Sequence, residues 1–378
     1  MDLYHHPNPP FTKWVVTSEL LASPFVIVDI GVQGGEHPRW KFLGSYADVY
    51  GYDAIAEVIE DLRWRNYLVS NRHYYNLALG DEDGERQFFV AANRFESSFY
   101  RGDPGAEERI VPIRRLDSLH REGVLPQADY IKLDCEGFEP EILRGTRLYL
   151  AESNVLCVTT ETNFNVSPTY PRTHFQAISD IMIDHRLILF DENHVRTPAP
   201  AYAAAITKRP WPEPNPVRGF PPLVVGRPGT YDMVFCRDLA AERREPGRFG
   251  PSKPPPELPS VDMLLKSMMN FELHGLMDCA VELAVTFQDL LAPRLDVEKA
   301  TTLLLSPAPH PRNTADITLC LSMIAELQTR LQSLGARSMG ARSVLAGAIN
   351  LVPQQTRRNL RKIIGERCTN AILSRLLR

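Results

Sequence analysis

Residues 25–35 read FVIVDIGVQGG, an apolar run that leads through an acidic residue into three glycines. The run from Phe25 to Val28 is too short for a helix and too apolar for a strand with one face in water. It therefore predicts a central strand of a parallel sheet that is covered on both faces. Gly31, Gly34 and Gly35 let the backbone turn tightly and approach a ligand closely. The stretch predicts a buried strand followed by a turn that faces a bound phosphate or nucleotide.

A second predicted strand ends in a carboxylate. It covers Val49–Asp53 and has the sequence VYGYD. In sheets that bind dinucleotides, an acid about twenty residues after the glycine turn takes the ribose hydroxyls. The two stretches together indicate a cofactor that contains adenosine.

Composition limits the class of protein. The chain of 378 residues has room for two domains, and its net charge of −4 supplies no general attraction for nucleic acid. The six cysteines form no CxxC pair and no zinc-finger spacing, which favours a reducing compartment over a disulfide framework. The sequence shows neither a cationic segment with an apolar leader nor an apolar run of about eighteen residues. We therefore expect a soluble, cytoplasmic protein with no signal peptide and no transmembrane segment.

Strands and helices alternate along the first part of the chain. Asp117 is expected to cap a short helix, and the polar segment 92–108 is expected to form a loop that could close over a site. The other elements expected here are helices at 37–47 and 54–65, a strand at 73–79, a hairpin through the turn 80–84 into 87–91, and an extended piece at 109–116.

Residues 128–136, ADYIKLDCE, are the second informative stretch. They predict a buried strand with Asp134 and Glu136 at its carboxyl end, which is the edge where open α/β sheets bind ligands. The next strand, at residues 155–161, again ends in an acid, Glu161, and is followed by Asn163. Later elements are expected as a helix at 140–147, a helix at 173–185, and strands at 187–192 and 231–237. This alternation predicts a mostly parallel sheet with helices on both faces.

The composition changes along the chain and suggests domain boundaries. Prolines crowd residues 198–228, which form either a surface hairpin or a lid that faces the substrate. Residues 356–378 are expected to form a basic, amphipathic helix. Its cationic face either lies in solvent or binds an anionic surface such as a membrane or nucleic acid. The helical region could cover the active site, form a homo-oligomer or dock a partner. The expected parts are an N-terminal extension (1–24), an α/β domain (25–240), a proline-rich linker (241–259) and an all-α C-terminal region (260–378).

An ordered set of motifs resembles the FkbM family of S-adenosylmethionine-dependent methyltransferases. The motifs are DIGVQGG, YGYDA, NLALGDEDGE, RRLDSL and DYIKLDCEGFEPEILRG. The densest match lies within residues 131–145, where the family pattern is met by Lys132, Asp134, Glu136, Gly137, Glu139, Leu143 and Gly145. The family commonly has Ala and Asn where this chain has Val32 and Gln33, and Glu-Pro where it has Asp53-Ala54.

The resemblance covers roughly Phe25–Arg237. It implies a class I methyltransferase fold, Rossmann-like, in which a seven-stranded, mostly parallel sheet ends in an antiparallel strand, here residues 231–237. It also implies S-adenosylmethionine as cofactor. The implied reaction is O-methylation of a hydroxyl on a sugar, glycan or secondary metabolite, so we expect a small-molecule or glycan acceptor.

The candidate site residues follow from these positions. Asp53 is expected to bind the ribose and Leu79 to lie near the adenine; the remaining cofactor candidates are Asp29, Gly31, Gln33, Gly34 and Asp134. Methyl transfer to a hydroxyl needs a base, for which the candidates are Asp134, Glu136, Glu161 and His174. Asp134 and Glu136 could instead be acids that cap a helix or stabilise a turn, and His174 could be a structural histidine.

Three further points stay open. Asp134, Glu161 and Asn163 could supply oxygen ligands to Mg²⁺, but their spacing is not diagnostic and no metal is predicted. A dinucleotide oxidoreductase would share the strand-glycine-acid pattern, although GVQGG is not GxGxxG. A scaffold that has kept the fold without catalysis is the other alternative.

Overall fold

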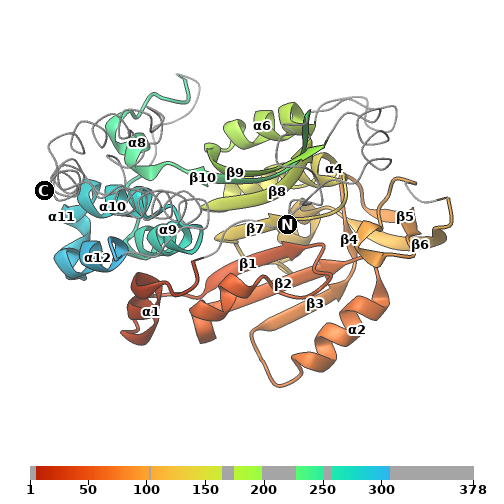
Figure 1. Ribbon diagram of the computed structural model, residues 1–378, viewed down its shortest axis with the longest axis horizontal. Helices are drawn as coiled ribbons and strands as arrows, with labels where there is room; N and C mark the ends of the chain where they lie inside the picture. Colours follow the sequence, from red (N-terminus) through yellow and green to blue (C-terminus); the bar gives the residue numbers. More distant parts are fainter. Residues whose placement is uncertain (1–5, 102–103, 164–173, 198–226, 251–256, 307–378) are drawn as a thin grey trace, which may run out of the picture. The chain divides into compact units, whose positions relative to one another are not determined.

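The computed structural model describes residues 6–101, 104–163, 174–197, 227–250 and 257–306 (Figure 1). The proline-rich segment up to residue 226 and the basic helix expected at 356–378 lie outside these residues. Within the part that is described, no helix is both long and apolar enough to cross a membrane.

The main sheet has seven strands in the order β3-β2-β1-β7-β8-β10-β9. The first five run parallel, whereas β10 pairs antiparallel with both β8 and β9. The predicted fold class, a mostly parallel Rossmann-like sheet of the class I methyltransferase type with an antiparallel last strand, is therefore confirmed. The strands are β1 (Phe25–Ile30), β2 (Ala47–Asp53), β3 (Arg72–Asn76), β7 (Tyr130–Leu133), β8 (Cys157–Asn163), β9 (Leu187–Thr197) and β10 (Arg227–Arg237).

A second, three-stranded sheet lies beyond the carboxyl ends of the parallel strands (Figure 1). It consists of β4 (Ala78–Leu79), β5 (Gly84–Val90) and β6 (Glu107–Arg114), in the order β4-β6-β5. The predicted hairpin between residues 73–79 and 87–91 is wrong, because β5 pairs with β6 and β4 also pairs with β6. The turn before β5 is held elsewhere, since Asp83 accepts hydrogen bonds from the Arg115 backbone (2.8 Å) and the Ser118 hydroxyl (2.6 Å).

Helices cover both faces of the main sheet. Adjacent strand residues point to opposite faces, and Ile27 packs in one hydrophobic cluster with Leu264 of α9 while Val28 packs in another with Ile178 of α6. The helices and 3₁₀ helices are α1 (Pro10–Thr17), η1 (Pro38–Tyr46), α2 (Ala56–Arg65), η2 (Arg94–Glu96), α3 (Leu116–Arg121), α4 (Glu139–Arg144), α5 (Arg147–Glu152), α6 (His174–Asp184), α8 (Leu239–Arg244), α9 (Val261–Leu273), α10 (Met277–Thr286), α11 (Gln288–Leu291) and α12 (Val297–Leu304).

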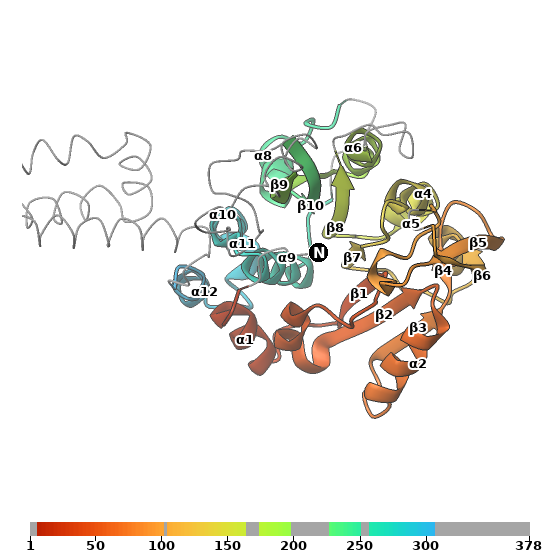
Figure 2. The same cartoon turned by 45° about the vertical axis from the view of Figure 1, so that its right-hand side comes forward.

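The described helices after residue 260 share a core with the sheet. One cluster joins residues of α9, α10 and α12 to Phe11 and Val15 of α1 and to Phe25 at the start of β1. In both views these helices lie on the opposite side of the main sheet from β4, β5 and β6 (Figure 1, Figure 2). The described part of the C-terminal region therefore lies away from the carboxyl edge of the strands. The domain boundaries themselves stay a prediction.

Two local predictions need correction between β6 and β8. Asp117 does not cap α3, whose N-cap residue is Arg115; instead its Oδ1 accepts a hydrogen bond from the backbone of Tyr149 in the first turn of α5 at 2.8 Å. The helix expected at 140–147 is divided into α4 and α5 at Gly145. A Cβ at Gly145 would lie 1.9 Å from the Gly80 carbonyl oxygen, so this close approach requires glycine.

Candidate active site

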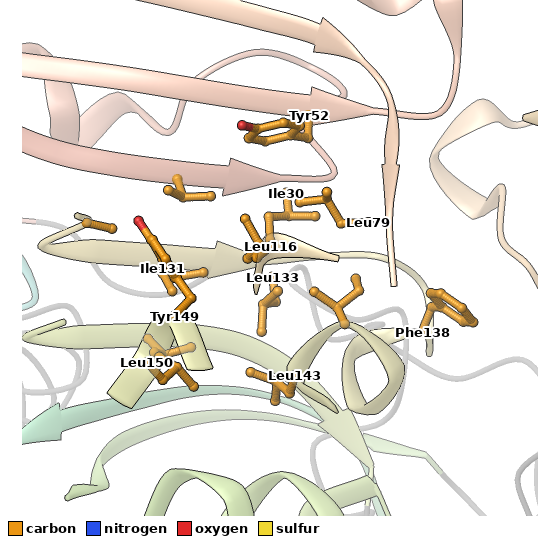
Figure 3. Packing of buried hydrophobic residues seen from close by; sticks show 14 of the residues in the cluster. Ile30, Tyr52, Leu79, Leu116, Ile131, Leu133, Phe138, Leu143, Tyr149 and Leu150 are labelled. Carbon is orange, nitrogen blue, oxygen red and sulfur yellow. The ribbon is translucent and has the colours of Figure 1, made fainter. Parts of the chain in front are cut away.

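A cavity of about 250 Å³ opens at the carboxyl edge of the parallel strands, and we call it the edge cavity. Ile30, Tyr52, Leu79 and Phe138 line it and belong to the hydrophobic packing beneath it (Figure 3). Six of the predicted site residues also line the edge cavity, namely Gly31, Gln33, Asp53, Leu79, Asp134 and Glu136. They meet because each lies at, or shortly after, the end of a strand, which is β1, β2 or β7 of the main sheet and, for Leu79, β4 of the smaller sheet.

The glycine turn after β1 is fixed by close backbone packing. Gly31 has φ +75°, and a Cβ there would lie 2.0 Å from the carbonyl oxygen of Asp134. Its amide donates to the Tyr52 carbonyl at 3.0 Å, so the turn is tied to the end of β2 as well as to β7. Glycine is therefore needed at position 31 to bring three strand ends together around the edge cavity.

A buried ion pair lies beneath this turn. Asp29 is fully buried and lies 3.0 Å from the ammonium group of Lys132, which also donates to the Gly31 carbonyl at 3.0 Å and lies 3.6 Å from Asp134. Burial alone would lower the pKa of Lys132, but Asp29 and Asp134 outweigh it and raise that pKa. Burial raises the pKa of Asp29, and Lys132 opposes the rise. Asp29 thus supports the turn through Lys132 and lies outside the lining of the edge cavity.

Asp53 stands at the end of β2 and lines the edge cavity. Its Oδ1 accepts a hydrogen bond from the Ile55 backbone at 2.8 Å, and the Gln33 backbone donates to the same carboxylate. Burial raises the pKa of Asp53 to about 6 despite these two donors. The carboxylate is thus placed and held by the backbone before any ligand binds.

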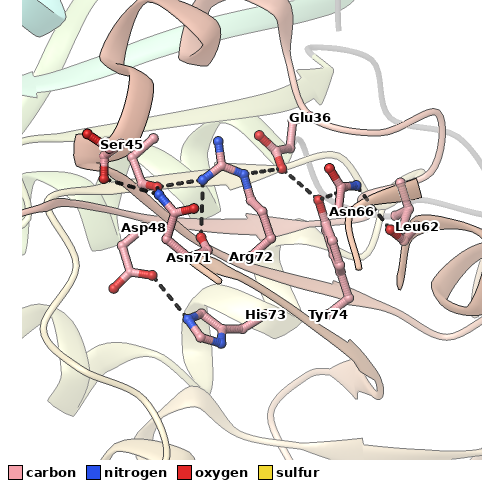
Figure 4. A network of polar contacts seen from close by, with 10 residues as sticks. Glu36, Ser45, Asp48, Leu62, Asn66, Asn71, Arg72, His73 and Tyr74 are labelled. Atoms are coloured by element: carbon pink, nitrogen blue, oxygen red, sulfur yellow. Dashed lines mark hydrogen bonds and ion pairs between the residues drawn. The ribbon is translucent and has the colours of Figure 1, made fainter. Parts of the chain in front are cut away.

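Gly34 lies on the outer side of the turn, in a second hollow of about 280 Å³ that we call the outer cleft. Residues of α2 line its other wall. The turn ends at Glu36, whose carboxylate lies 2.6 Å from Arg72 and accepts a hydrogen bond from the Tyr74 hydroxyl at 2.6 Å (Figure 4). These two contacts with β3 fix the far end of the glycine turn.

Three carboxylates lie close together next to the edge cavity, whose lining includes Asp134 and Glu136 but not Glu161. One oxygen each of Asp134, Glu136 and Glu161 can be chosen so that all three lie within 4.8 Å of one another. Burial, followed by the charge of Asp134, raises the pKa of Glu136 to about 7. Burial, followed by neighbouring acids, raises the pKa of Glu161 to about 9. At neutral pH the cluster therefore keeps at least one proton.

Glu136 has an unusual backbone conformation. Its φ of 51° lies in the left-handed region, where residues other than glycine, asparagine and aspartate are uncommon, and Gly137 follows with φ 96°. The Ser98 hydroxyl holds the strained peptide by donating to the Glu136 carbonyl at 2.9 Å. Strain of this kind is often kept where it positions a functional side chain.

Several residues near the site have roles that the sequence did not indicate, and the side chain of one predicted residue is not among those that the structure describes. Lys132 and Glu139 match the family motif, but the sequence indicated no role for either residue. Glu139 is buried and accepts a hydrogen bond from the Cys135 backbone at 2.8 Å. Burial raises its pKa to about 8. His174 begins α6, but its side chain is outside the described residues. The serine-containing loop at 92–108 does reach the site, because Ser97 and Phe99 line the edge cavity.

A family model matches part of the chain. Residues 40–184 match the family model described as the methyltransferase FkbM domain. This part of the chain is similar to that domain. The resemblance inferred from the sequence motifs is thereby confirmed, although the match begins after the glycine turn and ends before β9. No curated protein shows significant similarity to the chain.

Solved structures of methyltransferases are among the similar folds. A methyltransferase FkbM from Methylobacillus flagellatus KT aligns with 15% identity and a TM-score of 0.31 over 50% of this chain and 44% of its own. A precorrin-6y C5,15-methyltransferase from Geobacter metallireducens GS-15 aligns with 12% identity and a TM-score of 0.29, over 60% of this chain and 87% of its own. A magnesium protoporphyrin IX methyltransferase from Synechocystis PCC 6803, solved with SAH, has 10% identity and a TM-score of 0.29, with coverages of 60% and 79%. The chain thus spans less than half of the FkbM structure, and the fold assignment here depends on the sheet order.

Proposed function

We propose that the chain is an S-adenosylmethionine-dependent O-methyltransferase that acts on a hydroxyl of a sugar, glycan or secondary metabolite. The observation that carries this proposal is the edge cavity, where the glycine turn, a ribose-type acid and a cluster of protonatable carboxylates meet. A methyltransferase FkbM domain over residues 40–184 is consistent with it.

The residues of the edge cavity fit an adenosyl cofactor. Gly31 lacks the Cβ that would collide with β7, so the turn can stay close to a ligand. Asp53 offers carboxylate oxygens to the ribose hydroxyls, and Leu79 with Phe88 supplies apolar surface for the adenine. The bound cofactor would supply a methyl group on a sulfonium, which is already electrophilic.

The protein must then orient the acceptor hydroxyl and take its proton. Glu136 is the base we favour, because its pKa of about 7 lets the carboxylate exist at neutral pH and still attract a proton. Glu161 has a pKa of about 9 and is protonated at neutral pH, so it is suited to donate a hydrogen bond to the acceptor or to Glu136. Asp134 connects this group to Lys132, because its carboxylate lies 3.6 Å from the Lys132 ammonium and within 4.8 Å of both glutamates. Glu136 would take the proton of the acceptor hydroxyl as the oxygen receives the methyl group that bound S-adenosylmethionine would supply, with S-adenosylhomocysteine as the product.

The test is binding followed by turnover. Calorimetry on the full chain should show binding of S-adenosylmethionine and S-adenosylhomocysteine but not of NAD, and Asp53→Ala should weaken that binding at least tenfold. Asp289→Asn is a matched control, because that carboxylate is 59% exposed in α11, among the C-terminal helices. Transfer of an isotopically labelled methyl group to a panel of sugars, glycans and hydroxylated metabolites would then identify the acceptor class.

Three outcomes would contradict the proposal. Binding of NAD, with no binding of S-adenosylmethionine or S-adenosylhomocysteine, would favour the oxidoreductase alternative. Absence of any binding by folded wild-type chain would favour the scaffold alternative. Methyl transfer to thiols or amines, with none to hydroxyls, would keep the cofactor and overturn the O-methyl specificity.

A further inference from the structure

Three residues form a wall between the edge cavity and the outer cleft. Gln33, Arg94 and Phe95 line both hollows, one from the glycine turn and the other two from η2. The hollows measure about 250 and 280 Å³. Displacement of the wall would join them and open the edge cavity toward the outer cleft.

The Gln33 side chain holds this wall in place. With its amide oriented to match its neighbours, the amide nitrogen donates to the Arg94 carbonyl at 2.9 Å and the amide oxygen accepts from the Phe95 backbone at 3.0 Å. The backbone of the same residue donates to the carboxylate of Asp53. Gln33 therefore connects the ribose-type acid, the glycine turn and η2.

The segment around η2 is fastened firmly on its flanks. Ser98 pairs with Phe89 through two backbone hydrogen bonds of 2.9 and 3.1 Å, and Ser97 accepts from the Ala91 backbone at 3.1 Å. Between these anchors η2 projects outward, and the Phe95 side chain is 60% exposed. Flanks that are held on the protein and an exposed middle are the features of a short segment that can move as a unit.

Within the described part of the chain, few side-chain polar contacts join η2 to the rest of the site. Apart from the two Gln33 hydrogen bonds, Arg94 lies 3.8 Å from Glu57 of α2, and both of these side chains are more than 40% exposed. An ion pair at that distance and exposure holds weakly. The Gln33 amide is consequently the principal directional contact between η2 and the glycine turn.

We propose that Gln33 is a positioning residue that latches η2 over the edge cavity, and that the cofactor enters and leaves when this latch opens. The inference rests on the proposed function, because it takes the edge cavity as the cofactor site. Opening moves Arg94 and Phe95 away from Gln33 and joins the two hollows. Closing restores both hydrogen bonds and returns the Phe95 ring to the side of Gly34, where a Cβ would lie 3.3 Å from it.

The test compares rates with affinities. Surface plasmon resonance with S-adenosylhomocysteine gives the association and dissociation rates of wild type, Gln33→Leu and Gln33→Ala. Loss of two neutral hydrogen bonds should raise both rates on the order of tenfold, while Kd changes much less. A residue that only supports the bound ligand would instead raise the dissociation rate and leave association unchanged.

Hydrogen exchange and a control variant complete the test. The Phe95 amide donates to Gln33, so its exchange should become faster in both variants even without ligand. Gln127→Ala is the matched control, because the Gln127 amide, in the segment before β7, also donates to a backbone carbonyl, that of Glu152 at the end of α5, at 3.0 Å. Rates equal to those of wild type, a rise in dissociation alone, or unchanged exchange at Phe95 would overturn the latch. If the wild-type chain bound no ligand, the proposed function itself would be refuted. Faster exchange in the variants would then still support the contact of Gln33 with η2, but the proposed path of the cofactor past η2 would be refuted as well.

Discussion

Replacing Gly31 by alanine should destabilise the protein more than its backbone conformation alone explains. The φ of +75° costs a residue with a Cβ about 1–2 kcal/mol. The new Cβ would also lie 2.0 Å from the Asp134 carbonyl oxygen, and overpacking against a main chain adds about 1–3 kcal/mol. We expect a total loss of about 2–5 kcal/mol in the free energy of unfolding, measured by urea denaturation, together with weaker binding of S-adenosylhomocysteine.

Gly123→Ala separates the two contributions. Gly123 has nearly the same backbone conformation, with φ +70°, but nothing lies within 4 Å of the position its Cβ would take. Its substitution should cost only the conformational part, about 1–2 kcal/mol, and should leave ligand binding unchanged. If the two variants lost the same stability, the close packing of β1 against β7 would not be what requires glycine at position 31.

Three further variants test the charges of the site. Glu136→Gln should lower kcat about 10²- to 10⁴-fold with little change in ligand affinity, and the wild-type rise of kcat with pH through about 7 should disappear. Asp53→Asn should weaken ligand binding yet raise the stability of the protein at pH 8. The pKa of Asp53 is about 6 in the folded protein and 3.8 ordinarily, so the stability of the wild type falls as the pH rises between these two values. The variant should lack this fall. Lys132→Met should cost about 3–5 kcal/mol at pH 7 by leaving Asp29 buried without its cation, and less at pH 5 as Asp29 takes up a proton. The pH profile of kcat tests Glu136→Gln, and denaturation curves of wild type and variant at two pH values test the other two. A pH rise of kcat retained in Glu136→Gln, a fall in stability retained in Asp53→Asn, or an equal loss at pH 5 and pH 7 for Lys132→Met would contradict these expectations.

The strands of the site could be predicted because their information is local. An apolar run bounded by glycine and an acid already places Gly31 and Asp53 at strand ends, and parallel pairing then brings both to one edge with Asp134. The same local reasoning failed for β4 and β5, whose partner β6 lies later in the chain. A turn signal says where the chain reverses, but not which strand it will pair with.

Contacts between distant segments were the part that could not be predicted. Gln33 was expected to touch the cofactor, but nothing in GVQGG indicates that its amide matches the backbone of Arg94 and Phe95. Similarly, the apolar face of α9 predicts that it is buried, but not that it packs with α1 on the sheet. Amphipathic patterns give the face that is buried and leave the partner undetermined.

The carboxylate cluster connects the energetics of the fold to the proposed chemistry. Glu136 and Glu161 are held close together by strand ends, and burial raises the pKa of both, so in the free protein their ionisation is unfavourable. A sulfonium carries a positive charge, and a nearby positive charge favours ionised carboxylates. In the proposed reaction the cofactor would thus help Glu136 to lose its proton before the acceptor arrives, and the neutral product S-adenosylhomocysteine would remove that help after transfer. The charge that is costly in the free protein would then be stabilised only while a methyl group is available.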